Sequence, residues 1–269
     1  MDLDLVSSLL STSSIGRRIV YLPTTTSTMD VAREHVHGGA PSGLVVVADE
    51  QSAGRGRFGR AWVAPPAVNL LCTVLVRPTL EVAKRLGMVT PLAVADAVAA
   101  VGGPTVSFKW PNDVRAGGRK LCGILIEGEF AGERPAFALV GIGLNVNLDV
   151  AHHPEIADIA TSIMQEIGAP VSRERTLAAL LNAFEAHADN PDGEALRVAW
   201  RARLETLGQD VTVSFGGAVE HGRAEDVDAA GSLILRRADG SAVILPAGEV
   251  SLRLPAPAAG SSASSAPVP

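Results

Sequence analysis

A short basic loop constrains this chain more than any other feature. Residues 54–62 read Gly-Arg-Gly-Arg-Phe-Gly-Arg-Ala-Trp, so that Arg55, Arg57 and Arg60 fall close together with no acidic residue among them. The chain as a whole is acidic, with a formal net charge of −6 over 269 residues. A local reversal of sign among glycines is typical of a loop that folds around an anion.

Two other interpretations of this loop are weaker. Residues 54–59 match the dinucleotide fingerprint G-x-G-x-x-G, but that fingerprint must open a helix, and Pro65 and Pro66 exclude a long helix here. Arginine–glycine segments that bind RNA are repetitive and unfolded, whereas this is a single copy between two apolar runs. We therefore favour an ordered loop that binds phosphate and carboxylate groups in an enzyme.

Composition excludes several classes of protein. A hydrophobic content of 47% in 269 residues is enough for a full core and a small second domain, and the negative charge argues against a general nucleic-acid binder. No uninterrupted apolar stretch reaches transmembrane length, and the first residues lack a basic signal region, so we expect a cytoplasmic protein with no membrane partner. Cys72 and Cys122 lie in apolar runs, which predicts buried thiols rather than a disulfide or a metal site.

Lysine is rare in this chain. Of the 23 basic residues only Lys84, Lys109 and Lys120 are lysines. A lysine that persists among arginines indicates a place where a compact ammonium cannot be replaced by a guanidinium. Lys109 and Lys120 lie eleven positions apart in one motif-rich stretch, whereas Lys84 falls on an expected exposed helix face and needs no special explanation.

The apolar pattern predicts a mixed region of helices and strands. We expect strands over 18–22, 44–48, 69–76, 106–109, 119–127 and 136–147, and helices over 27–37, 80–101, 173–187 and 192–207. Pro23 is expected to end the first strand, and Pro91 to start or kink the second helix. Ser27, with Asp30 three residues later, matches a capping box that opens the first helix.

The sequence pattern changes at Gly208. Short strand-like segments follow, separated by glycine turns of which Asp239-Gly240 is the clearest, and they predict a small antiparallel barrel. Residues 255–269 consist mainly of Pro, Ala and Ser, which predicts a disordered tail. We therefore divide the chain into an extension (1–17), a main domain (18–207), a barrel (208–254) and a tail (255–269).

Five groups of residues occur in an order that resembles the biotin–protein ligases. They are Ser27-Thr28, Gln51-x-x-Gly54-Arg-Gly-Arg-x-Gly-Arg-x-Trp62, Lys109-Trp-Pro-Asn-Asp113, Arg119-Lys-Leu-x-Gly-Ile-Leu-x-Glu127 and Gly141-x-Gly-x-Asn145. The resemblance covers about residues 18–254. It implies an α+β fold, in which a central mixed sheet with flanking helices is related to class II aminoacyl-tRNA synthetases and is followed by an SH3-like barrel.

The resemblance also implies a reaction. The family joins biotin to ATP with Mg²⁺, forming biotinyl-5′-AMP and pyrophosphate, and then passes biotin to one lysine of a biotin carboxyl carrier domain of an acyl-CoA carboxylase. The main domain is accordingly expected to bind biotin and ATP. The sequence identifies no ligands for the metal.

The family's site residues carry over onto matching positions here. For biotin they are Ser27, Thr28, Gln51, Gly54, Arg55, Lys120 and Gly123; for ATP and the adenylate they are Arg55, Arg57, Arg60, Trp62, Asn112 and Asn145. Lys120, Arg57 and Asp113 are the expected catalytic residues. Acyl-adenylate formation brings a carboxylate against a triphosphate, and clustered cations would reduce that repulsion while positioning both groups. Asp113 is the candidate that steers or deprotonates the acceptor lysine.

The chain departs from the family in two places, and two alternatives stay open. Met29 stands where the family often has Asn, and there is no room before Arg18 for a helix-turn-helix domain, so we expect no DNA binding. Lipoate–protein ligases share the fold and the adenylate chemistry but lack the arginine loop. A relative that binds biotin or RNA without turnover is disfavoured because Lys120 and Asp113 are both present. The sequence leaves open whether the chain forms a homodimer.

Overall fold

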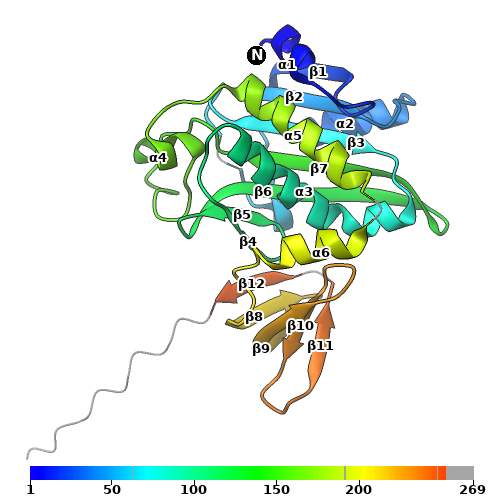
Figure 1. Ribbon diagram of the computed structural model, residues 1–269, viewed down its shortest axis with the longest axis vertical. Helices are drawn as coiled ribbons and strands as arrows, with labels where there is room; N and C mark the ends of the chain where they lie inside the picture. The colour runs from blue at the N-terminus through cyan, green and yellow to red at the C-terminus, as the bar shows by residue number, and fades with distance from the viewer. Residues whose placement is uncertain (63, 191, 247, 253–269) are drawn as a thin grey trace, which may run out of the picture.

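The main part of the chain is a seven-stranded sheet with helices on both faces (Figure 1). The computed structural model describes residues 1–62, 64–190, 192–246 and 248–252. The strands are β1 (Arg18–Thr25), β2 (Leu44–Gln51), β3 (Leu70–Val76), β4 (Ser107–Lys109), β5 (Asp113–Ala116), β6 (Arg119–Ala131) and β7 (Arg134–Leu144). Their order is β1-β2-β3-β7-β6-β5-β4, and since only β1 and β2 pair in parallel, the expected mixed sheet is confirmed.

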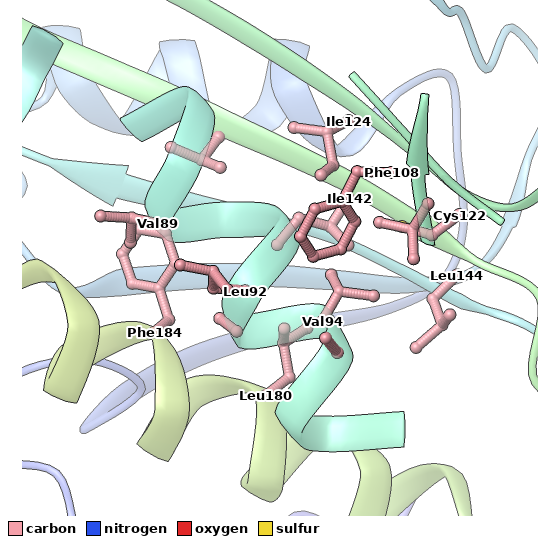
Figure 2. Close-up of a cluster of buried hydrophobic side chains, with 14 of the residues drawn as sticks. Val89, Leu92, Val94, Phe108, Cys122, Ile124, Ile142, Leu144, Leu180 and Phe184 are labelled. Carbon is pink, nitrogen blue, oxygen red and sulfur yellow. The ribbon is translucent and has the colours of Figure 1, made fainter. Parts of the chain in front are cut away.

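Successive side chains of a strand point to opposite faces of the sheet, so each face can be covered by its own helices. The helices are α1 (Leu3–Leu9), α2 (Thr28–His37), α3 (Leu80–Ala100), α4 (Ile163–Ile167), α5 (Arg173–Ala188) and α6 (Gly193–Arg201). Val45 and Val47 of β2 face the core shared with α3 and α5, while Leu44 and Val46 face the smaller core under α2. Figure 2 shows the larger core, where side chains of α3 and α5 meet Phe108 and Ile142.

Two predicted boundaries are wrong, each for a physical reason, and one of two alternatives is excluded at Pro91. Strand β1 continues through Pro23 because β1 is an edge strand, where a missing N–H costs no ladder hydrogen bond. Pro91 lies inside α3, so the alternative in which a helix starts at Pro91 is excluded, and the kink stays a prediction. Helix α6 ends at Arg201 rather than at residue 207, because the chain then pairs with β4 through Phe108 N–H to Arg203 O and Glu205 N–H to Phe108 O.

The first residues of the chain pack against α5. The Glu185 carboxylate accepts hydrogen bonds from the backbone N–H groups of Ser13, Ser14 and Ile15 and from the Ser14 hydroxyl. These donors lower the pKa of Glu185 to about 2, despite an opposing contribution from burial. One ionised side chain thus fixes the segment between α1 and β1.

The carboxyl-terminal region forms a second, all-antiparallel sheet. Its strands are β8 (Asp210–Phe215), β9 (Ala218–Val227), β10 (Leu233–Arg236), β11 (Ala242–Leu245) and β12 (Glu249–Leu252), in the order β11-β10-β9-β8-β12. The turn at Asp239-Gly240 joins β10 to β11 as predicted, with Gly240 at φ +84°. Strand β12, which the sequence did not suggest, pairs with β8. The predicted disordered tail, residues 255–269, lies outside the described residues.

The two sheets share one hydrophobic core. Trp110, which follows β4, donates from its indole nitrogen to the carbonyl of Gly231, in the turn that joins β9 to β10 of the second sheet, at 2.9 Å. Cys72 and Cys122 are buried free thiols, as predicted, and burial raises the pKa of Cys72 to about 12. Within the ranges described, no helix has both the length and the apolar character needed to span a membrane.

Candidate functional site

A cavity of about 480 Å³ opens on the α2 face of the main sheet. Phe137 and Leu139 fill this face of β7 beside α2, but the next two positions on the same face are Gly141 and Gly143. Gly123 of β6 pairs with Gly143, so two glycines lie side by side in the floor. The missing side chains hollow out a space of the size that small-molecule sites use.

Trp62, at the end of the arginine loop, lies against this glycine floor. A Cβ atom on Gly143 would come within 2.7 Å of the Trp62 ring, and one on Gly123 would also come within 2.7 Å. The indole Nε1 is buried without a hydrogen-bond partner among the described residues, and Lys120 Nζ lies 5.5 Å from the ring centroid. The floor therefore accepts a flat ring or a thin chain, and a side chain there would exclude both.

The predicted biotin-binding side chains form one polar wall. Thr28 and Ser27 open α2, and both are almost fully buried. Gln51, at the end of β2, accepts hydrogen bonds from the Thr28 N–H at 2.7 Å and from the Thr28 hydroxyl at 3.0 Å. The Thr28 hydroxyl also lies 2.9 Å from that of Thr73, which places this wall at the β3 side of the cavity.

Met29 provides an apolar surface beside that wall. It is buried under α2, and its sulfur would lie 2.9 Å from a Cβ atom on Gly141. The thioether therefore packs on the glycine strand at the position where the family often carries an amide.

The other half of the predicted capping box does not form. Ser27 caps the helix by accepting from the Met29 N–H at 3.3 Å, but Asp30 instead accepts two hydrogen bonds from Arg55, at 2.9 and 2.6 Å. This pairing lowers the pKa of Asp30. Arg55 thereby ties the arginine loop to the helix that carries the polar wall.

Gly54 and the other two arginines lie in different surroundings. Gly54 does not line the cavity, because the loop folds over it and its carbonyl accepts from the Trp62 N–H at 3.0 Å. Arg57 donates to the Gly248 carbonyl at 2.9 Å and to the Asn112 side chain at 3.3 Å, and burial lowers its pKa. Arg60 is more exposed and pairs with Glu249 of β12.

Lys120 and Asp113 form an ion pair of 2.6 Å on the same side of the sheet. In a regular strand, Lys120 and Gly123 would face opposite ways. The register between β5 and β6 shifts, since Arg115 pairs with Lys120 while Val114 pairs with Cys122. This bulge turns the Lys120 side chain towards the cavity.

The two predicted asparagines are held by protein hydrogen bonds. Asn145 donates to the Thr161 carbonyl at 2.9 Å and accepts from the Asn69 side chain at 3.1 Å. Asn112 donates to the Ile124 carbonyl at 2.8 Å and accepts from Arg57. Both line the cavity, but most of their hydrogen-bonding capacity is already used.

Sequence reasoning missed three features of the cavity wall. Two of these are the segment 156–160 beside Lys120 and residues 248–250 at the start of β12. The third is the partner of the lining residue Arg55, since Asp30 lies behind the wall and neutralises that guanidinium. The segment 156–160 joins the site because the Lys120 N–H donates to the Ile159 carbonyl at 2.8 Å. The two segments carry no motif, so no sequence signal was available, whereas Asp30 was assigned to the capping box instead of to Arg55. Among the described residues, no group of three or more His, Cys, Asp or Glu is placed to hold a metal ion.

Comparison with known proteins agrees with this geometry. A model of the Biotin/lipoate A/B protein ligase family matches residues 21–145, and a model of the Biotin protein ligase C terminal domain matches residues 206–253. The chain is 34% identical over 256 residues to Biotin--[acetyl-CoA-carboxylase] ligase of Mycobacterium tuberculosis, covering 90% of this chain and 91% of the relative. It is 39% identical over 216 residues to the Paracoccus denitrificans ligase of the same name, covering 76% and 88%.

Solved structures of biotin protein ligases are also similar to this chain. The biotin protein ligase from Aquifex aeolicus in complex with biotin and ATP is similar at a TM-score of 0.74 and 26% identity, covering 88% of this chain and 99% of that one. The Leishmania major ligase in complex with biotinyl-5-AMP has a TM-score of 0.58 and 27% identity, covering 85% and 98%. On sequence, fold and the residues gathered around its glycine floor, this chain belongs to the biotin protein ligase family.

Proposed function

We propose that this chain is an ATP-dependent biotin–protein ligase, which forms biotinyl-5′-AMP and transfers the biotinyl group to a lysine of a biotin carboxyl carrier domain. One observation carries the proposal: a single cavity holds the polar wall, the glycine floor, the arginine loop and the Lys120–Asp113 pair. Similar enzymes are named Biotin--[acetyl-CoA-carboxylase] ligase, and a similar solved ligase holds biotin and ATP.

Biotin would enter with its ring towards β3 and its carboxylate towards β5. Ser27, Thr28 and Gln51 supply hydroxyl and amide groups at the β3 side, which suit the polar ureido ring. The Trp62 ring lies directly on Gly143 and Gly123, so this ring would lift to admit the aliphatic tail over the glycines and would then cover it. The carboxylate then arrives beside Lys120.

Adenylation is a displacement at the α-phosphorus by the biotin carboxylate, and the two anions repel each other. Arg57 is the guanidinium best placed to reduce this repulsion, since its partners are neutral oxygen atoms and its full charge is available to a ligand. Lys120 supplies a compact second charge. Because both groups are held in place before substrate binds, their contribution comes from positioning and electrostatics rather than from covalent chemistry.

Arg55, Arg60 and Asn145 take secondary parts in this proposal. Arg55 is already neutralised by Asp30 and would hold the loop in place, leaving its backbone to face biotin. Arg60 pairs with Glu249 at the exposed rim, where ATP phosphates would compete with that carboxylate. Asn145 would offer adenine only the hydrogen-bonding capacity that Thr161 and Asn69 leave free.

Magnesium would arrive with ATP. A nucleotide-bound Mg²⁺ is held largely by phosphate and water oxygens, with one or two carboxylates from the protein. Asp158 and Glu249 line the cavity and could supply them. The ion's chemistry is to reduce the negative charge on the phosphates.

Transfer needs an acceptor lysine that has lost its proton. Asp113 lines the cavity beside Lys120 and is the carboxylate closest to the reacting centre that this proposal assigns. It would attract the incoming ammonium group and accept its proton, so that the free amine attacks the acyl carbon of biotinyl-AMP and AMP leaves. We also propose that the main domain is related in fold to class II aminoacyl-tRNA synthetases, that the carboxyl-terminal sheet is an SH3-like barrel, and that the protein is cytoplasmic.

The experiment compares two substrates. Pyrophosphate release is measured with ATP and biotin, and in parallel with ATP and lipoate, followed by labelling of a carrier domain. Release with biotin alone supports the proposal. Release with lipoate alone makes the chain a lipoate ligase, and binding of biotin without pyrophosphate release makes it a binding protein without turnover.

A further inference from the structure

The basic residues that line the cavity differ in whether an acid neutralises them. Four of the six are paired within the described structure: Arg55 with Asp30, Arg60 with Glu249, Arg115 with Glu205 and Lys120 with Asp113. Arg57 donates hydrogen bonds only to neutral oxygen atoms within the described structure and also lies over the Phe58 ring. The Lys109 ammonium has no hydrogen-bond or ion-pair partner among the residues described, although Lys109 lines the same cavity and is half-buried.

A half-buried ammonium without an acidic partner destabilises the free protein until an anion binds to it. Burial lowers the pKa of Lys109, as expected for an ammonium that has lost water without gaining a carboxylate contact. Asp113 on the next strand attracts the Lys109 ammonium, but the Asp113 carboxylate forms its ion pair with Lys120. Lys109 is also one of only three lysines in the chain, and the chemistry assigned above does not use it.

The register of the sheet shows where Lys109 lies relative to the substrates. Gly143 pairs with Gly123, Gly123 with Asp113, and Asp113 with Lys109, so these four residues form one row from β7 to β4. Paired residues face the same way, and neighbouring strands are about 4.8 Å apart. Lys109 therefore lies at the far end of the row from the glycine floor, beyond the Lys120–Asp113 pair.

We infer that Lys109 binds the β- and γ-phosphates of ATP and the pyrophosphate that leaves, a role that rests on the proposed ligase function. In an in-line displacement, the attacking and leaving oxygens lie on opposite sides of phosphorus. If biotin lies along the glycine floor, its carboxylate oxygen attacks from the β6 side. The bond between the α-phosphorus and the bridging oxygen then breaks towards β4, and pyrophosphate takes the electron pair as it leaves, beside Lys109.

The test separates the two half-reactions. Lys109→Gln should slow pyrophosphate release from ATP and biotin by about 10- to 100-fold, the range expected when a charged hydrogen bond is lost. It should raise the KM for inorganic pyrophosphate in the reverse reaction by a similar factor. Transfer from pre-made biotinyl-AMP, which carries neither the β- nor the γ-phosphate, should stay within about twofold of wild type.

Matched controls make each outcome informative. Lys84→Gln removes an exposed lysine on α3, and it should change neither half-reaction. Lys109→Arg keeps the positive charge and should retain most of the pyrophosphate affinity. In the wild-type protein, inorganic pyrophosphate should protect Lys109 but not Lys84 from an amine-reactive label, which tests the contact without relying on a variant that folds.

Three results would overturn the inference. They are an unchanged KM for pyrophosphate in Lys109→Gln, an equal loss of both half-reactions, and no protection of Lys109 by pyrophosphate. An equal loss of adenylation and transfer would mean that Lys109 positions Asp113 and does not bind the leaving pyrophosphate. A failure of the proposed function itself looks different, because wild-type protein would then release no pyrophosphate from ATP and biotin.

Discussion

Lys120 Nζ lies 2.6 Å from Asp113 Oδ1, so the cation proposed for adenylation and the carboxylate proposed for transfer neutralise each other. The two residues come from neighbouring strands, and both are partly open to solvent. Each must leave the other, in part, for its own step: Lys120 to face the substrate anions, and Asp113 to face the acceptor amine. In these proposed roles, the pair would link the two half-reactions.

Lys120→Arg should lose adenylation by on the order of 100-fold, because a planar guanidinium in place of a compact ammonium displaces both anions by about 1 Å. The variant should fold normally, and transfer from pre-made biotinyl-AMP should suffer less. Pyrophosphate release and single-turnover transfer measure the two effects. Near-normal pyrophosphate release would mean that Lys120 is ordinary surface charge.

Asp113→Asn should have the opposite profile. The amide cannot accept a proton from the acceptor lysine, so we expect transfer at neutral pH to fall by about 100-fold, within the range for loss of a general base. Adenylation should fall less than tenfold, since Lys120 keeps its charge. Raising the pH should partly restore transfer, because more of the acceptor lysine is then unprotonated. Equal loss in both half-reactions would assign Asp113 a structural role instead.

Gly143→Ala should close the cavity floor. The new methyl group would lie 2.7 Å from the Trp62 ring, so either the ring moves or biotin loses its space. We expect a loss of biotin affinity of at least about tenfold with little change in stability, and a shift in tryptophan fluorescence. Gly87→Ala, in α3 with nothing within 4 Å of its new Cβ, is the matched control and should leave both measurements unchanged. Unaltered biotin binding in Gly143→Ala would exclude the floor as the site.

Trypsin should cut the arginine loop of the free protein and spare it when biotin and ATP are present. Arg60 should be cut first, since its side chain is 64% exposed whereas Arg55 is held by Asp30 and Arg57 is half-buried. The order of fragments can be followed by mass spectrometry. Equal cutting with and without ligands would show that the loop takes no part in binding.

Glu185 should make stability depend on pH in acid. Its pKa is about 2 in the folded protein against 4.5 in the reference state, so its contribution is fully present above about pH 4.5 and is lost as pH falls towards 2. Because solvent screens this partly exposed carboxylate, that contribution is on the order of 2–3 kcal/mol, below the full value of the pKa difference. In denaturant titrations at pH 6, the free energy of unfolding of Glu185→Gln should be smaller than that of wild type. At pH 3 the difference between the two proteins should shrink. Glu34→Gln, on the exposed face of α2, should show no such convergence.

The sequence by itself determined the chemistry available to this protein. Four local patterns carry it: the arginine loop, Ser27-Thr28, residues 109–113 and Gly141-x-Gly143. Each combines residue types that only a few kinds of site need. Most strands and helices were also predictable, because alternation of apolar residues and capping by Ser27 and Ser172 act over a few positions. The buried state of both cysteines followed from the same local signal.

Only the tertiary structure decided which charges meet. Asp30 neutralises Arg55 and Glu249 pairs with Arg60, across 25 and 189 positions of the chain, and no local pattern encodes such distances. A one-residue shift in the register between β5 and β6 turns Lys120 to the cavity face, and the row from Gly143 to Lys109 exists only because four strands align. Motifs specify what a site can contain, whereas sheet register and long-range packing fix where each charge lies and which one is left without a counterion.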